Sequence, residues 1–86
     1  MTVKVEVYST TYCPFCRAAE RMLDSKGVKH EVFDVTHDPE KRQWLVQTTG
    51  MTTVPQIFIN DQAIGGFTDM RTLEQEGKLD QMLGIA

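Results

Sequence analysis

The only two cysteines of this 86-residue chain, Cys13 and Cys16, are separated by Pro14 and Phe15. The surrounding pattern places the pair between a strand and a helix, so Cys13 stands at the helix start. There, free backbone N–H groups and the positive end of the helix dipole favour a thiolate over a thiol. We therefore predict a redox-active dithiol with an exposed, ionised Cys13. Cys16, one turn further on, is expected to be more buried and less ionised and to resolve the mixed disulfide that Cys13 forms.

The same cysteine spacing also serves as half of a zinc site. A zinc ion normally takes four ligands, and the chain offers only the isolated His30 and His37 to complete the set. Pro14 also removes an amide that could donate to a metal-bound sulfur. Redox chemistry is the favoured interpretation, and no metal site is predicted.

Composition narrows the class of protein further. The chain is 41% hydrophobic and 24% charged, with a net charge of −3 and no basic run, so nucleic acid is not an expected partner. Two cysteines are too few for a secreted disulfide framework, and no apolar stretch suits a signal peptide or a membrane span. We expect one domain over residues 1–86, in the cytoplasm and away from membranes.

Hydrophobic periodicity predicts an alternation of strands and helices. Val3, Val5 and Val7 alternate with polar neighbours, and a helical apolar stripe starts at Phe15. Asp38 is the expected N-cap of a second helix, with Pro39 in its first turn. The expected elements are a strand over 3–8, a helix from 14 to about 27, a strand over 29–34, a helix over 39–49, strands over 54–59 and 62–64 joined by a hairpin turn, a helix capped by Thr68 or Asp69 and ending near 77, and a last helical turn over 79–83.

This order predicts an α/β fold. The first strand, helix and strand form a βαβ unit with parallel strands, whereas the short turn at Asn60-Asp61 makes the last two strands antiparallel. A four-stranded mixed sheet with helices on both faces follows. In the second helix, Trp44, Leu45 and Val46 are expected to point inward.

The second candidate site segment is Thr53-Val54-Pro55. A proline that opens an apolar strand is a candidate for a cis peptide bond, which would leave the N–H and C=O of Val54 unpaired and facing outward. Those groups could pair with an extended peptide as a short added strand. The alternative is an ordinary edge-strand proline.

The third segment runs from Gly65 to Asp69. Its two glycines permit a close backbone approach, and the helix start behind them offers N–H groups to a carboxylate. Asp69 could then hold an amine, and a carboxylate site beside an amine site suits the α-amino acid end of a small peptide. The alternative is a tight turn followed by a helix cap.

Together, and in this order, the three segments resemble the dithiol glutaredoxins, and the resemblance extends from Val5 to Asp80. It implies a thioredoxin-like fold and glutathione-dependent reduction of protein disulfides and of glutathione mixed disulfides. It also implies glutathione as co-substrate, no permanently bound cofactor, disulfide-containing or glutathionylated client proteins, and a monomer.

Carried over by position, the resemblance makes Cys13 the nucleophile and Cys16 the resolving thiol. Thr53 and Val54 would pair with the cysteinyl unit of glutathione, the segment from Phe67 to Asp69 would hold its γ-glutamyl end, and Arg42 would meet its glycyl carboxylate. The implied glutathione-binding residues are Phe15, Arg42, Thr53, Val54, Pro55, Gly66, Phe67, Thr68 and Asp69.

The chain departs from many relatives at Thr10 and Met51, where a basic residue is common, and at Thr68, where an aspartate is common. The rim around Cys13 is therefore less positive.

Two alternative functions stay open. A thioredoxin-like donor served by a flavin reductase is disfavoured because no tryptophan precedes Cys13 and no Gly-Pro pair separates the cysteines. A glutathione-ligated iron–sulfur carrier is disfavoured by Pro14.

Overall fold

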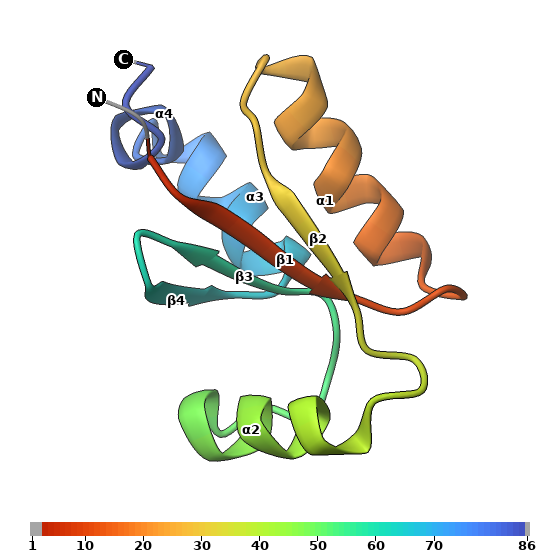
Figure 1. Cartoon of the computed structure of the whole chain (residues 1–86). Helices are drawn as coiled ribbons and strands as arrows, with labels where there is room; N and C mark the ends of the chain where they lie inside the picture. The colour runs from red at the N-terminus through yellow and green to blue at the C-terminus, as the bar shows by residue number, and fades with distance from the viewer. Residues whose placement is uncertain (1–2, 86) are drawn as a thin grey trace.

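The computed structural model describes residues 3–85. Helices and strands alternate along the chain much as the periodicity predicts (Figure 1). The elements are β1 (Val5–Ser9), α1 (Pro14–Ser25), β2 (Glu31–Asp34), α2 (Pro39–Thr49), β3 (Gln56–Ile59), β4 (Gln62–Gly65), α3 (Phe67–Gln75) and the short α4 (Leu79–Met82). None of the helices within this part of the chain is long and apolar enough to cross a membrane.

The four strands form one mixed sheet in the order β2-β1-β3-β4. β1 and β2 are parallel, with Val7 opposite Val32, whereas β1 and β3 are antiparallel, with Val7 opposite Ile57. β3 and β4 form an antiparallel hairpin through Asn60 and Asp61, both at positive φ. The predicted sheet is confirmed, and its two central strands bring the first segment, which follows β1, close to the second, which precedes β3.

Helices cover both faces of the sheet, as predicted: α1, α3 and α4 lie on one face and α2 on the other (Figure 1). The period-two alternation of β1 and β3 sends alternate side chains to the two faces. Those of Val5, Val7, Ile57 and Ile59 pack against Leu23 and its neighbours in the larger core. Full burial of one such side chain contributes about 1.5–3 kcal/mol, so this face anchors the fold.

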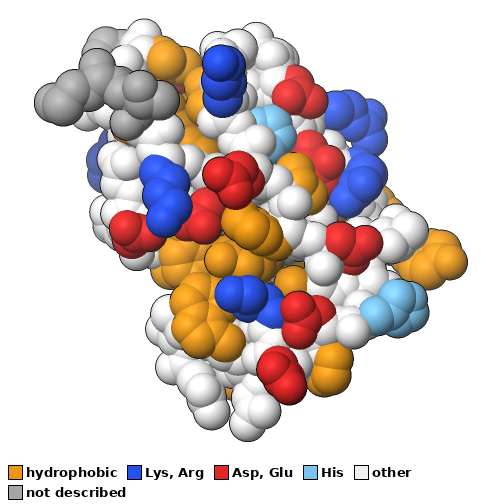
Figure 2. Space-filling model, in the orientation of Figure 1, with side chains coloured by type: hydrophobic (Ala, Val, Ile, Leu, Met, Phe, Trp, Pro, Cys, Tyr) orange, Lys and Arg blue, Asp and Glu red, His pale blue; other side chains and the backbone are white. Residues whose placement is uncertain are grey.

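The smaller core under α2 corrects one prediction. Leu45 packs with Tyr8, Val35 and Phe58 and is 1% exposed, but Trp44 is 40% and Val46 38% exposed. Consecutive helical residues are turned by about 100°, so three in a row cannot all face the sheet. Trp44 instead stacks on Phe58 at the edge of this core, with the two ring centroids 5.9 Å apart. Figure 2 shows apolar side chains gathered on the surface between the sheet and α2.

The helix starts are set by residues visible in the sequence, with one exception. Asp38 caps α2 by accepting from the Lys41 N–H at 3.0 Å, and Pro39 opens the helix, as predicted. α3 begins at Phe67 with Gly66 as its N-cap, so neither Thr68 nor Asp69 is the cap. Asp69 is the third helical residue and reaches back to the cap, which is a common alternative use of an acidic residue in the first turn.

Candidate active site

Cys13 is the N-cap of α1. Its backbone is extended, and its Sγ accepts a hydrogen bond from the Cys16 N–H at 3.2 Å, in the place that a serine or aspartate oxygen usually takes. Both cysteines are free thiols in this structure, and Cys13 is only partly buried. Its sulfur can therefore be reached by a substrate.

Cys16 lies one turn further into α1 and is fully buried. Burial raises the pKa of the Cys16 thiol to about 12, and the hydrogen bond with Cys13 acts in the same direction. The Thr10 backbone amide and the Arg17 charge oppose that rise. Cys16 therefore keeps its proton at neutral pH, as predicted for the inner sulfur.

Arg17 is held beneath the dithiol rather than beside the sulfur of Cys13. Its Nη2 lies 3.4 Å from both Ser9 Oγ and the Thr10 carbonyl oxygen, and 2.8 Å from Glu20 Oε2. That carboxylate oxygen is buried and receives no well-angled hydrogen bond, so its pairing with Arg17 is by charge. The pairing offsets part of the positive potential that Arg17 brings to the loop.

The loop that carries Cys13 is tied to the loop after β2. The Thr11 N–H donates to Thr36 Oγ1 at 2.9 Å, and Thr36 in turn donates to Asp34 through its hydroxyl and its backbone N–H. These hydrogen bonds, led by the one from the Thr36 hydroxyl, lower the pKa of the Asp34 carboxyl. Sequence reasoning missed this support, because Thr11 is more than 20 residues away from both Asp34 and Thr36, and neither threonine carries a local signal of the contact.

Val54 lies directly opposite Cys13. The Val54–Pro55 peptide bond is cis, as predicted. The expectation that both polar groups of Val54 are free needs correction: the carbonyl oxygen is 3.6 Å from Cys13 Sγ and accepts its thiol proton. The Val54 N–H has no hydrogen-bond acceptor among residues 3–85. The Val54 N–H is therefore free to donate to a ligand in this structure. The Val54 carbonyl becomes free to accept when Cys13 loses its thiol proton.

A groove of about 280 Å³ lies beside the dithiol and brings most of the predicted binding residues together. One wall is aromatic: the rings of Phe15 and Phe67 stack with centroids 6.2 Å apart. Met51 is the one lining residue that was not among the predicted binding residues. The lining is Phe15, Met51, Thr53, Val54, Pro55, Gly66, Phe67, Thr68 and Asp69.

Arg42, the remaining predicted binding residue, lines a second hollow of about 270 Å³ instead. Met51, Thr53 and Val54 line both hollows, so the two are adjoining parts of one surface. Arg42 Nη2 lies 3.4 Å from the Thr52 carbonyl oxygen. The structure therefore places Arg42 at the far end of the surface from the α3 N-terminus.

Asp69 serves as a helix-capping group in this structure. Its Oδ2 accepts from the Gly66 N–H at 2.9 Å, and a side chain at Gly65 would place its Cβ 2.3 Å from that oxygen. Gly65, at φ +107°, is therefore required for this turn. The turn-and-cap alternative describes what Asp69 does here, and the second carboxylate oxygen stays available to a ligand.

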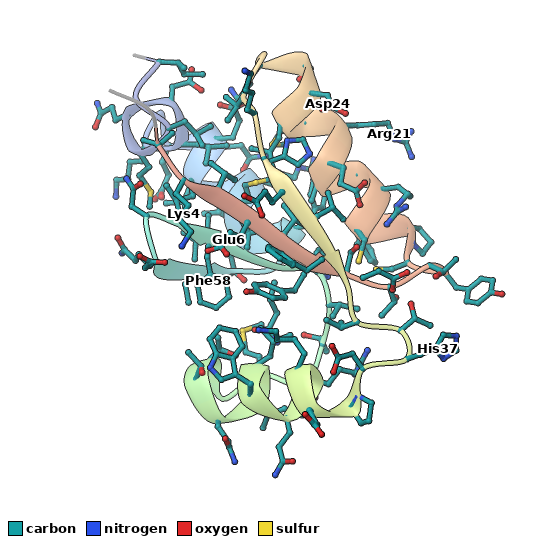
Figure 3. All side chains as sticks on the ribbon, viewed as in Figure 1. Lys4, Glu6, Arg21, Asp24, His37 and Phe58 are labelled. Carbon is teal, nitrogen blue, oxygen red and sulfur yellow. The ribbon has the colours of Figure 1, made fainter. Side chains whose placement is uncertain are left out.

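The two histidines lie apart from one another and have other surroundings. Figure 3 shows His37 projecting outward from the loop between β2 and α2, whereas His30 Nδ1 lies 3.1 Å from the Val28 carbonyl oxygen. Within residues 3–85, no three or more His, Cys, Asp or Glu side chains are close enough together to hold a metal ion.

Comparison with known proteins places this geometry in a family. The family model described as glutaredoxin matches residues 5–64. Glutaredoxin 3 of Escherichia coli strain K12 is 42% identical over 79 residues, which cover 92% of this chain and 95% of that protein. The glutaredoxin of Pseudomonas aeruginosa is also 42% identical over 79 residues, with coverages of 92% and 94%.

Solved structures agree with the sequences. The crystal structure of a buckwheat glutaredoxin–glutathione complex is similar to this one, with a TM-score of 0.88 and 30% sequence identity. The aligned region covers 93% of this chain and 76% of the buckwheat chain. The solution structure of the dithiolic glutaredoxin 2-C-Grx1 of Trypanosoma brucei brucei has a TM-score of 0.84 and 39% identity, with coverages of 92% and 84%. The chain belongs to the glutaredoxin family, within the thioredoxin-like superfamily, and is a glutathione-dependent thiol–disulfide oxidoreductase.

Proposed function

We propose that the protein reduces glutathione mixed disulfides and protein disulfides, with Cys13 as nucleophile and Cys16 as resolving thiol. One observation carries this proposal: the sulfur that caps α1 lies 3.6 Å from the carbonyl oxygen of Val54, and Val54 lines a groove together with seven of the other eight residues expected to hold glutathione. The buckwheat relative with a similar fold is described as a glutathione complex, which supports the same ligand here.

For a glutathionylated client, the Cys13 thiolate attacks the sulfur of the glutathione moiety. The disulfide of the substrate breaks, the client leaves as a thiolate that takes up a proton, and Cys13 becomes bonded to glutathione. A second glutathione thiolate then attacks the glutathione sulfur of that mixed disulfide. Glutathione disulfide leaves, and the Cys13 thiolate is restored.

For a protein disulfide, Cys13 first forms a mixed disulfide with one client sulfur, and the other client sulfur leaves as a thiolate. Cys16 then loses its proton and attacks Cys13 Sγ, which releases the second client thiolate and closes the Cys13–Cys16 disulfide. Because the pKa of Cys16 is raised to about 12, this proton must be transferred during the attack. The departing client thiolate is the base at hand. Two glutathione molecules then reduce the enzyme disulfide.

We propose that the groove holds glutathione in an extended form. The free Val54 N–H and the carbonyl released by Cys13 ionisation pair with the cysteinyl unit, as a short added strand. At one end, the N–H groups of α3 and the Thr68 hydroxyl meet the γ-glutamyl carboxylate, and the unused oxygen of Asp69 meets its amine. At the other end, Arg42 meets the glycyl carboxylate.

The remaining parts of the proposal follow from this chemistry. Glutathione is consumed as a co-substrate, so the protein works without a permanently bound cofactor. A reducing compartment is required to keep the dithiol reduced, and the cytoplasm supplies one. The clients are disulfide-containing or glutathionylated proteins, and the protein acts as a monomeric single domain over residues 1–86.

Two single substitutions test the division of labour between the cysteines. Cys13→Ser should abolish reduction of both a glutathionylated peptide and a protein disulfide, because it removes the nucleophile. Cys16→Ser should abolish reduction of the protein disulfide alone, because glutathione itself resolves the first mixed disulfide. Rates are followed by NADPH oxidation with glutathione and glutathione reductase, and in parallel with thioredoxin reductase. Equal losses in the two variants, or turnover with thioredoxin reductase alone, would contradict the proposal.

A further inference from the structure

Gln56, the first residue of β3, has a buried side chain that contacts the backbone of the segment joining α2 to β3. Figure 1 shows the course of that segment from α2 to the sheet. Gln56 is 2% exposed, and its Nε2 donates to the carbonyl oxygens of Met51 and Thr53, each at 3.0 Å. A backbone carbonyl can only accept, so the amide group must present its NH₂ to both. Both hydrogens of the Gln56 amide are thus used on one short stretch of backbone.

The other end of the same amide is attached to α2. Gln56 Oε1 lies 2.8 Å from Thr49 Oγ1, and that hydroxyl oxygen accepts from the Met51 N–H at 3.1 Å. The Thr49 hydroxyl also lies 2.8 Å from the Leu45 carbonyl oxygen, so its single proton serves one acceptor at a time. Gln56 therefore links the last turn of α2 to the segment that follows it.

These contacts impose an alternation on the carbonyl groups from residue 51 to residue 54. The carbonyls of Met51 and Thr53 point inward to Gln56, whereas the Thr52 carbonyl is met by Arg42 at 3.4 Å. The next carbonyl in the series, from Val54, is 3.6 Å from Cys13 Sγ. The Gln56 amide thus holds two of the four carbonyl groups of residues 51–54, and Arg42 and Cys13 contact the other two.

We propose that Gln56 is a positioning residue that sets the affinity for the glutathionyl group through the backbone it holds; its side chain, although 2% exposed, also borders the hollow that Arg42 lines. The inference rests on the proposed function, in which Val54 pairs with the cysteinyl unit and Arg42 with the glycyl carboxylate. Both depend on the direction of the backbone between residues 51 and 54. Cys13 Sγ, by contrast, accepts from the Cys16 N–H of α1 and donates to the Val54 carbonyl, and Gln56 makes no hydrogen bond to either residue, so we expect Cys13 reactivity to be little affected.

Substrate affinity and thiol reactivity should therefore separate when Gln56 is changed. Gln56→Met keeps the length of the side chain and removes both donors, so the two carbonyls lose their partner. The KM for a glutathionylated peptide, at saturating glutathione, should rise about tenfold, the size expected for roughly one to two lost hydrogen bonds. The rate of Cys13 alkylation by iodoacetamide, measured across pH, should match that of the wild type.

Gln75→Met is the matched control, because Gln75 is an exposed residue of α3 with no such contacts. It should leave both the KM and the alkylation profile unchanged. Urea unfolding of each variant separates a loss of folded protein from a change in the folded protein's affinity.

Gln56→Glu provides a second variant should the methionine variant not fold. Its carboxylate keeps the shape of glutamine but cannot donate when ionised, whereas the protonated form regains one donor. The KM of this variant, relative to wild type at the same pH, should therefore be raised at neutral pH and approach the wild-type value as the pH is lowered. A ratio that does not change with pH would contradict the assigned role of the donors.

The outcomes also distinguish this inference from the proposed function. An unchanged KM in a folded Gln56→Met protein, beside a wild type that is saturated by the glutathionylated peptide, would overturn the inference alone. An altered alkylation profile with unchanged KM would do the same. A wild-type protein that shows no turnover of the glutathionylated peptide would overturn the proposed function and this inference together.

Discussion

At the scale of single residues, Cys13 is both a structural cap and a nucleophile. The hydrogen bond that its sulfur accepts from the Cys16 N–H satisfies one of the free donors in the first turn of α1, and the same sulfur is the proposed nucleophile. Cys16 differs only in depth: one helical turn is enough to bury it fully and to raise the pKa of its thiol. Two identical side chains thus acquire opposite roles from their positions on one helix.

The raised pKa of Cys16 predicts a loss of stability at alkaline pH. The folded value of about 12 lies above the ordinary value of 9.0, so the unfolded chain ionises first. Stabilisation from this thiol is complete below about pH 9 and is lost as the pH rises toward 12. The free energy of unfolding in urea should fall over this range more steeply in wild type than in Cys16→Ala. Parallel pH curves for the two proteins would mean that Cys16 is not held neutral by burial.

At the scale of elements, much of the fold follows from the sequence because the signals are local. The alternation of Val3, Val5 and Val7 defines a strand within a few residues, and Asp38-Pro39 marks a helix start wherever the helix lies. The start of α3 was misplaced because its cap is Gly66, which has no side chain to signal the role. Asp69, which does carry a signal, reaches the cap from inside the helix.

The candidate site was predictable in part for the same reason. The three segments that line it each carry a local signature, so their residues could be assigned before the structure was known. The groups that hold those segments in place have none. Gln56 reads as a strand residue, and the contact between Thr11 and Thr36 joins loops 25 residues apart. Only the tertiary structure shows which ordinary polar residues lie beneath the site.

Lys26 connects three helices, and its removal should destabilise the fold without affecting catalysis. Its Nζ lies 2.5 Å from Glu74 Oε2 and 2.6 Å from Asp80 Oδ1, which ties the end of α1 to α3 and α4. The hydrogen bonds that Lys26 donates, first the one to Asp80 and then the one to Glu74, raise the pKa of Lys26. Lys26→Met should lower the free energy of unfolding by about 0.5–1 kcal/mol, as is usual for a partly exposed ion pair.

Urea unfolding at low and high salt checks this prediction. The destabilisation should shrink as salt screens the charges, while turnover of a glutathionylated peptide stays at the wild-type rate. Lys78→Met is the matched control, because Lys78 is well exposed and its nearest carboxylate, on Glu76, is 3.8 Å away. If the two substitutions lowered the free energy of unfolding equally, the contacts of Lys26 with α3 and α4 would not stabilise the fold more than an ordinary surface lysine does.

At the scale of the whole molecule, charge works against the proposed ligand. The protein carries a net charge of −3, and glutathione, with two carboxylates and one ammonium group, is also an anion at neutral pH. Among residues 3–85, Asp69 is the only charged side chain that lines the groove beside Cys13, and Arg17 is paired with Glu20. Binding must therefore depend on hydrogen bonds and on the aromatic wall more than on long-range attraction.

Met51 is the position where an added charge should reveal this balance. It lines both hollows between Arg42 and the groove, so a lysine there would face the bound anion. Met51→Lys should lower the KM for a glutathionylated peptide several-fold at low ionic strength, since one unit charge near a surface contributes on the order of 1 kcal/mol. The gain should fade at about 0.5 M salt, where the screening length is only a few ångströms. Gln47→Lys adds the same charge on an exposed part of α2 that lines neither hollow, and it should leave the KM nearly unchanged. If both lysines lowered the KM equally, the overall charge of the protein, rather than the local field at the groove, would govern how the anion is captured.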